Sequence, residues 1–203
     1  MSHYSEKHYT PNKEFDRFYY NLFFKKGDKI LDIGCSTGNF IIQDPKNMVG
    51  IDIDLDAINI AKKRNLVVFH LKNPRKLPFK NETFDKIHCR HVLEHLKDPL
   101  DFMKEIIRIL KKDGKLILMT DKYTGKFWDD YTHQRPYNIK SLEQLAYDSN
   151  FRKFKSYNFP AQGVFGTGFL FKHRIISPKF AKKLYYLFGK VFKQDGLILE
   201  AIK

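Results

Sequence analysis

The sequence contains little cysteine and no long apolar run. Cys35 and Cys89 are its only cysteines, too few for a disulfide framework, which favours a reducing compartment. No apolar stretch is long enough for a transmembrane helix, and the first residues, MSHYSEKHYT, lack the apolar core of a secretory signal. We therefore expect a cytoplasmic protein.

Aromatic residues and basic charge are, by contrast, plentiful. Of the 203 residues, 42% are hydrophobic and 15% are aromatic, which suits one globular domain with a sizeable core. The net charge is +14, and residues 151–203 alone carry 11 Lys and Arg against 2 Asp and Glu. This basic quarter suggests an anionic membrane surface or nucleic acid as a partner, although such lysines also serve solubility alone. The oligomeric state is not predicted by any feature of the sequence.

Within that quarter, residues 164–193 alternate aromatic and aliphatic side chains with lysines. The pattern predicts a basic amphipathic helix. Such a helix either lies on a membrane or over an acyl substrate, or packs its apolar face on the domain.

Short apolar runs alternate with helical patterns up to residue 121. The predicted strands are residues 29–34, 47–54, 66–71, 84–92 and 115–121, and the predicted helices between and before them are 11–26, 55–65 and 98–114. This alternation predicts an α/β fold with a doubly wound, mostly parallel sheet and helices on both faces. A helix at 141–150 and strands at 151–159 and 195–203 follow, and the last strand is expected to be antiparallel. We predict a single domain over residues 1–203.

Two predicted helices have recognisable ends. Asp98 and Pro99 are typical of a helix start, and Gly114 is predicted to end that helix. Asp54 can cap the helix at 55–65, which leaves Asp52 available for a ligand.

A glycine turn follows the first predicted strand, with the sequence DIGCSTG at residues 32–38. Gly34 would allow the sharp turn, and Gly38 would let the next segment pack closely. A dinucleotide-binding turn would carry glycine at positions 36 and 39, where this chain has serine and asparagine. Asp52, at the end of the second strand, has the spacing of a carboxylate that accepts hydrogen bonds from ribose hydroxyls.

Three segments carry a family resemblance: ILDIGCSTGNF (30–40), VGIDID (49–54) and residues 77–118, which contain LPF, FD, VLEHL and RILKKDG. Together they resemble the class I S-adenosylmethionine-dependent methyltransferases, in particular their small-molecule, type 11-like subgroup. The resemblance implies a Rossmann-like sheet of seven strands and S-adenosylmethionine as cofactor.

The resemblance also implies a set of cofactor-binding residues. Those around the methionine part of the cofactor would be Asp32, Gly34, Cys35, Ser36 and Gly38. Asp52 would bind the ribose, Ile53 would pack on the adenine, and Asn73 would accept a hydrogen bond from the adenine amino group. Arg90 and His91 would lie beside the reacting methyl group.

For catalysis we predict two histidines, His91 and His133, as candidate bases that take a proton from the methyl acceptor. The N-terminal arm and helix (1–26) precede the sheet, and two segments, 122–138 and 160–193, would cover the substrate. The chain lacks the N/D-P-P-Y/F motif of enzymes that methylate base amines. We therefore expect a small-molecule acceptor, with RNA or a lipid at a membrane as the alternative.

The sequence allows three other interpretations. His91-x-x-Glu94-His95 matches the inverted zinc-peptidase motif, in which both histidines lie on one face of a helix. A metal-dependent methyltransferase is a milder version, but no metal ligand is assigned. A cofactor-binding module without catalysis is the third possibility.

Overall fold

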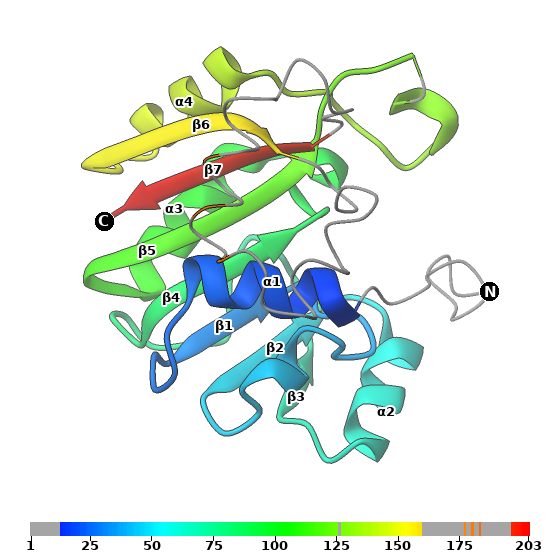
Figure 1. Ribbon diagram of the computed structural model, residues 1–203. Coiled ribbons are helices and arrows are strands. Elements are labelled where there is room, and N and C mark those ends of the chain that lie inside the picture. Colours follow the sequence, from blue (N-terminus) through cyan, green and yellow to red (C-terminus); the bar gives the residue numbers. More distant parts are fainter. Residues whose placement is uncertain (1–12, 126, 160–176, 178–179, 181–182, 184–195) are drawn as a thin grey trace.

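The computed structural model describes residues 13–125, 127–159, 177, 180, 183 and 196–203 (Figure 1). The predicted N-terminal arm and almost all of the basic segment 160–193 lie outside the described residues. Within the described part of the chain, no helix has the length and apolar character needed to cross a bilayer.

In the part of the chain that the structure describes, seven strands form one sheet. They are β1 (Ile30–Ile33), β2 (Met48–Asp52), β3 (Val68–His70), β4 (Phe84–Arg90), β5 (Leu110–Asp121), β6 (Lys153–Phe159) and β7 (Gly196–Ile202). Their order in the sheet is β3-β2-β1-β4-β5-β7-β6. The first five strands pair in parallel, and β7 runs antiparallel to both β5 and β6. The predicted fold class, including the antiparallel last strand, is confirmed.

Helices cover both faces of this sheet (Figure 1). The described helices are α1 (Lys13–Phe23), α2 (Leu55–Lys63), α3 (Pro99–Ile109) and α4 (Ile139–Asp148), with short 3₁₀ turns η1 (Ile41–Gln43), η2 (Leu93–His95) and η3 (Phe127–Asp129). Strand β5 shows why both faces are apolar. Leu116 and Leu118 join the core under α3 and α4, whereas Ile117 and Met119 join the core under α1 and α2.

The predicted end of one helix differs from the structure. Gly114 does not end α3, because the helix already stops at Ile109 and Gly114 lies inside β5. The register of β4 against β5 shifts between Phe84 and Lys86, so the residues after Ile109 enter the sheet as an irregular strand start. Such bulges leave no simple signal in the hydrophobic pattern.

The predicted helix starts are confirmed in position. Asp54 caps α2, since its carboxylate accepts hydrogen bonds from the backbone N–H groups of Asp56 and Ala57. Asp98 precedes Pro99 at the start of α3, but its side chain makes no capping hydrogen bond and pairs with Arg75 instead. Because Asp54 caps α2, Asp52 does not serve as the cap of this helix.

Candidate functional site

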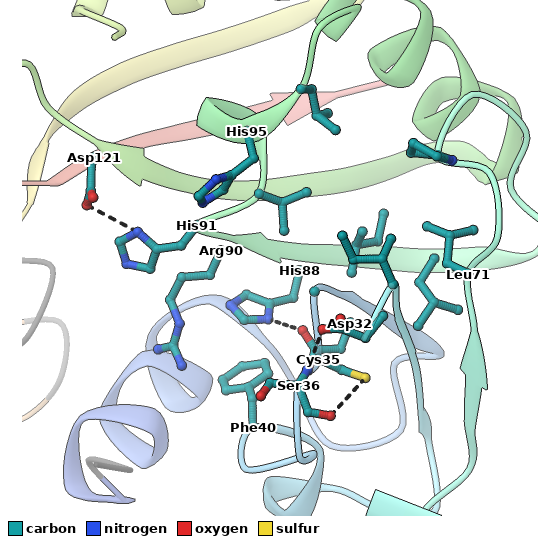
Figure 2. Close-up of a pocket in the computed structure, with 18 of the residues that line it drawn as sticks. Asp32, Cys35, Ser36, Phe40, Leu71, His88, Arg90, His91, His95 and Asp121 are labelled. Atoms are coloured by element: carbon teal, nitrogen blue, oxygen red, sulfur yellow. Dashed lines mark hydrogen bonds and ion pairs between the residues drawn. The ribbon is translucent and has the colours of Figure 1, made fainter. Parts of the chain in front are cut away.

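A cavity of about 1580 Å³ opens at the carboxyl ends of β1, β2 and β4 (Figure 2). Its walls come from the turn after β1, the ends of these strands, the start of α1 and the loop after β5. The strand order reverses between β1 and β4. Ligands of doubly wound sheets bind at this topological switch point, so the cavity lies where the fold predicts a site.

The glycine turn shapes one wall of the cavity. Gly34 has φ +77°, and a Cβ atom built there would lie 2.4 Å from Cγ2 of Val92. The backbone N–H groups of Gly34 and Cys35 both donate to the carbonyl oxygen of Ile51, at 2.9 and 3.1 Å. Gly38 has φ +82° and packs against Leu66, but it does not line the cavity. Gly38 therefore supports the turn from behind.

Asp52 ties β2 to that turn. One carboxylate oxygen accepts from the backbone N–H of Ser36 at 2.7 Å, and the other accepts from that of Asp54 at 2.8 Å. Burial raises the pKa of Asp52, and the two backbone hydrogen bonds oppose this shift. Asp52 lines the cavity beside Ile53, whose side chain is 62% exposed and offers an apolar surface. Binding of the ribose by Asp52 and of the adenine by Ile53 stays a prediction.

Asp32 and His88 form a buried pair at the floor of the cavity (Figure 2). Nδ1 of His88 lies 2.6 Å from Oδ1 of Asp32, and both side chains are 2% exposed. The second oxygen of Asp32 is buried and has no hydrogen-bond partner among the described residues. A buried carboxylate oxygen at a cavity wall suits a positively charged donor, such as the ammonium group of S-adenosylmethionine. The residues therefore fit this cofactor.

His88 gives the site a pH-dependent stability. Burial lowers the pKa of His88, against the opposing effect of Asp32, so the unfolded chain binds a proton at a higher pH than the folded chain does. The free energy of unfolding should therefore fall as the pH drops below about 6.5, the ordinary histidine value. His88→Asn keeps a donor towards Asp32 but cannot titrate. Denaturant unfolding at several pH values between 5 and 7 should show that the free energy of unfolding depends less on pH in this variant than in the wild type. An equal dependence on pH would contradict the assignment.

Helix α1 contributes residues that the sequence analysis did not single out. Asp16 is 1% exposed, and its Oδ1 lies 2.8 Å from Nη1 of Arg90. The guanidinium of Arg90 also lies over the rings of Phe15 and Phe40, at about 6 Å from their centroids. The sequence feature that could have revealed Asp16 is the presence of an acidic residue among the apolar residues of the predicted helix. Arg90 lines the cavity, and the start of α1 forms part of the cavity wall. A place for Arg90 beside the reacting methyl group stays a prediction.

His91 marks the acceptor side of the cavity. It adopts φ +53° and follows β4, which ends two residues before the predicted boundary. Its Nδ1 lies 3.2 Å from Glu94 and 3.1 Å from Asp121. Burial opposes a charge on His91, but hydrogen bonds to Asp121 and Glu94 outweigh burial and raise its pKa to about 9. An imidazolium has no lone pair for a proton, so His91 fits the role of a base only at high pH.

His133, the other predicted base, lies behind the cavity wall. Its side chain is 8% exposed, it is not a lining residue, and its Nδ1 lies 2.6 Å from the carbonyl oxygen of Phe127. Its ring centroid is 4.7 Å from that of His95, which does line the cavity. The catalytic roles of His91 and His133 stay predictions.

Two further predicted cofactor residues differ in their surroundings. Cys35 lines the cavity, and burial raises the pKa of its thiol, which keeps the sulfur protonated. Asn73 is exposed and does not line the cavity; its side-chain oxygen accepts from the backbone N–H of Arg75. Binding of adenine by Asn73 stays a prediction.

The zinc-peptidase interpretation is wrong for this structure. It requires His91 and His95 one turn apart on an α-helix. His91 instead has a left-handed backbone, and only the 3₁₀ turn η2 follows it. In the described residues, the two groupings of possible metal ligands place His91 with Asp121 and His95 with His133, so the motif histidines do not share a group.

Comparisons with known proteins agree with the geometry. Residues 7–156 match the family of methyltransferase domains. The chain is 33% identical over 159 residues to an uncharacterised protein of Methanocaldococcus jannaschii, covering 71% of this chain and 57% of that protein. It is 30% identical over 151 residues to the demethylmenaquinone methyltransferase of Lactobacillus johnsonii, covering 66% and 62%. The crystal structure of a SAM-dependent methyltransferase from Archaeoglobus fulgidus matches with a TM-score of 0.67 and 20% identity, over 94% of this chain and 92% of that one.

The chain therefore belongs to the class I S-adenosylmethionine-dependent methyltransferases, as its motifs predicted. It spans about half the length of the curated relatives it matches first.

Proposed function

We propose that this protein transfers the methyl group of S-adenosylmethionine to a small-molecule acceptor. The observation that carries the proposal is the paired arrangement at the switch point. The carboxylate of Asp52 closes the glycine turn, and the unpartnered oxygen of Asp32 lies at the floor of the same cavity. These are the hydrogen-bonding groups that an adenosyl ribose and an ammonium require.

The protein does not need to activate the methyl group itself. The bound cofactor supplies a methyl group that its sulfonium already activates. Asp52 and Ile53 would bind the nucleoside, and Asp32 with the Gly34 turn would hold the amino-acid part. Arg90, fixed by Asp16, closes the cavity on the side of α1. The remaining task is to place an acceptor in line and to exclude water, and positioning alone can supply several kcal/mol.

The acceptor side of the cavity supports a small molecule. His91, His95, Asp121 and Asp130 line it, and the volume of about 1580 Å³ leaves room for an acceptor beside the cofactor. The similarity to the demethylmenaquinone methyltransferase is consistent with such an acceptor. The alternatives of RNA or a lipid at a membrane rest on residues 160–193, which lie almost wholly outside the described part of the chain.

Calorimetry with the full chain tests the cofactor first. Binding of S-adenosylmethionine and of its demethylated product, without binding of NADH, is expected because the turn lacks the dinucleotide glycines. A screen for methyl transfer to phenols, quinols, amines and bulk RNA would then identify the acceptor class. If neither sulfur nucleoside binds, the proposal fails; methylation of RNA alone would overturn the small-molecule acceptor.

A further inference from the structure

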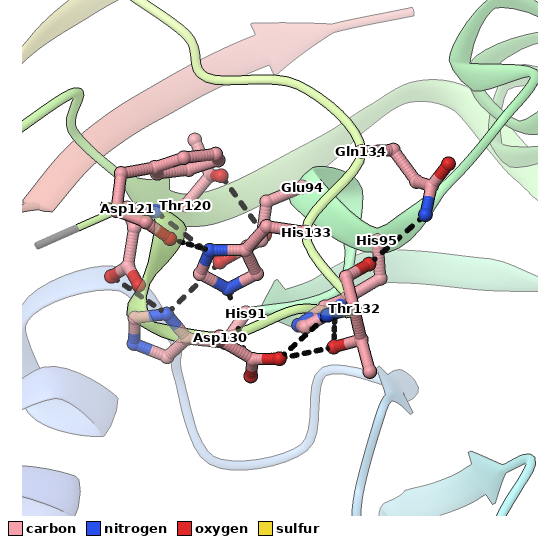
Figure 3. Close-up of polar contacts among 10 residues, drawn as sticks. His91, Glu94, His95, Thr120, Asp121, Asp130, Thr132, His133 and Gln134 are labelled. Atoms are coloured by element: carbon pink, nitrogen blue, oxygen red, sulfur yellow. Dashed lines mark hydrogen bonds and ion pairs between the residues drawn. The ribbon is translucent and has the colours of Figure 1, made fainter.

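A compact group of metal-ligating side chains lies beside the acceptor side of the cavity (Figure 3). It consists of Glu94 and His95 from η2 and His133 from the loop between β5 and α4. One donor atom from each residue lies within 4.8 Å of the donor atoms of the other two. This group differs from the sequence motif H-x-x-E-H, because its second histidine is His133 and not His91.

The hydrogen bond of His133 fixes its tautomer. Its Nδ1 lies 2.6 Å from the carbonyl oxygen of Phe127. A carbonyl oxygen only accepts, so Nδ1 must carry the proton, and Nε2 of the neutral ring then carries the lone pair. The nearest oxygen of Asp130, Oδ2, lies 3.9 Å from that Nε2. Nε2 is therefore the nitrogen with which His133 could bind a metal ion.

His95 is fixed in the same way through Thr132. The Thr132 hydroxyl donates to Oδ1 of Asp130 at 2.6 Å, and Nδ1 of His95 lies 2.9 Å from the same hydroxyl oxygen. A hydroxyl has one proton, so Nδ1 of His95 is the donor in the second bond. Each imidazole thus donates from one nitrogen to an oxygen, which is the arrangement that orients histidine ligands in metal sites.

Glu94 completes the cluster from the protein interior. Its side chain is fully buried and accepts hydrogen bonds from the Thr120 hydroxyl and from the backbone N–H of Asp121. Its carbonyl oxygen accepts from the backbone N–H of Gln134 at 2.7 Å. The loop that carries His133 is therefore tied directly to η2, and the three ligands are held together by the fold.

We propose that Glu94, His95 and His133 bind one divalent transition-metal ion, of which Zn²⁺ is the representative. Two imidazoles with one carboxylate suit zinc or ferrous iron, whereas Mg²⁺ and Ca²⁺ favour ligand sets made of oxygen alone. Ligand bonds of about 2.0–2.2 Å require the donors to move closer together than they are in this structure. Of the three ligands, His95 lines the cavity, so an ion held by them would lie at the cavity wall on the acceptor side. The inference goes beyond the proposed function, because an acceptor oxygen that reached the ion would be held and polarised by it.

Metal binding by the full chain tests this proposal without any methyl transfer. After treatment with a chelator, titration with Zn²⁺ should show one tight site per chain, and Mg²⁺ should not compete. In His133→Asn the amide nitrogen can occupy the place of Nδ1 and keep the bond to Phe127, but Nε2 is lost. This variant should bind Zn²⁺ at least about tenfold more weakly. The matched control is His70→Gln, which removes a histidine outside the cluster and can keep the contact to Ile53.

Binding of the demethylated cofactor to each variant separates the two proposals. Loss of zinc affinity in His133→Asn with unchanged cofactor binding supports the metal site. Absence of tight zinc binding in the wild type, equal zinc affinity in His133→Asn, or an equal loss in His70→Gln would overturn it. Zinc binding by a chain that binds no sulfur nucleoside would instead support the metal site and reject the proposed methyl transfer.

Discussion

Asp52→Ala should weaken the binding of S-adenosylmethionine by about 1.5–3 kcal/mol, the range of lost hydrogen bonds to a charged group. This corresponds to a dissociation constant that rises roughly 10- to 150-fold. The carboxylate is held by the backbone N–H groups of Ser36 and Asp54, and Asp52 lines the cavity. Calorimetry with the cofactor, at a temperature where unfolding measurements show the variant to be folded, measures the loss. Unchanged affinity would reject the ribose-binding role.

The neighbouring Asp54 supplies the control for that experiment. Its side chain caps α2 and is half-buried. Asp54→Ala should lower the free energy of unfolding by about 1 kcal/mol, as expected for a lost N-cap, and should leave cofactor affinity nearly unchanged. The substitution of Asp52 would then lower mainly the affinity for the cofactor, whereas the substitution of Asp54 would lower mainly the free energy of unfolding.

Gly34→Ala should lower the free energy of unfolding by about 2–5 kcal/mol. About 1–2 kcal/mol comes from forcing an alanine to a positive φ, and about 1–3 kcal/mol comes from overpacking. The crowding has an identified partner, because the new Cβ atom would lie 2.4 Å from Cγ2 of Val92. Denaturant unfolding measures this effect, and cofactor affinity should fall as well, since Gly34 lines the cavity.

Two further variants separate strain from crowding. Gly27 has φ +92°, and apart from its chain neighbours no atom of the described residues lies within 4 Å of the place that a Cβ atom would take. Gly27→Ala should therefore show the conformational cost alone, about 1–2 kcal/mol. In the double variant Gly34→Ala with Val92→Ala, the loss should be smaller than the sum of the single losses, because the crowding atom is gone. Additive losses would show that Val92 is not the source of the crowding.

The fold was predictable because central strands of the parallel part contain apolar runs that are buried on both faces. Residues 30–33 at β1 and 115–121 within β5 are such runs, and both form central strands. The exact end of α3 was not predictable in the same way. It depends on a register shift against Phe84, a tertiary event to which the local pattern around Gly114 gives no clue.

Some residues of the candidate site were likewise predictable from the local sequence, and others were not. Gly34, Ser36 and Asp52 were predictable, because a turn and an acid at fixed distances along the chain form one motif. Asp16 and His88 were not, because each acquires its role from a partner far away in the sequence, Arg90 and Asp32 respectively. The convergence of His95 with His133 likewise depends on how the loop after β5 folds back onto η2.

The position of β7 has a consequence for synthesis on the ribosome. This strand comes after the other six in the chain, yet it lies between β5 and β6 and pairs with both along its whole length. The five parallel strands can assemble as soon as β5 has emerged, but β5 then exposes an unpaired edge until residues 196–202 arrive. During that interval β6 has no neighbour in the sheet, so the nascent chain must hold an open edge that could pair with other molecules.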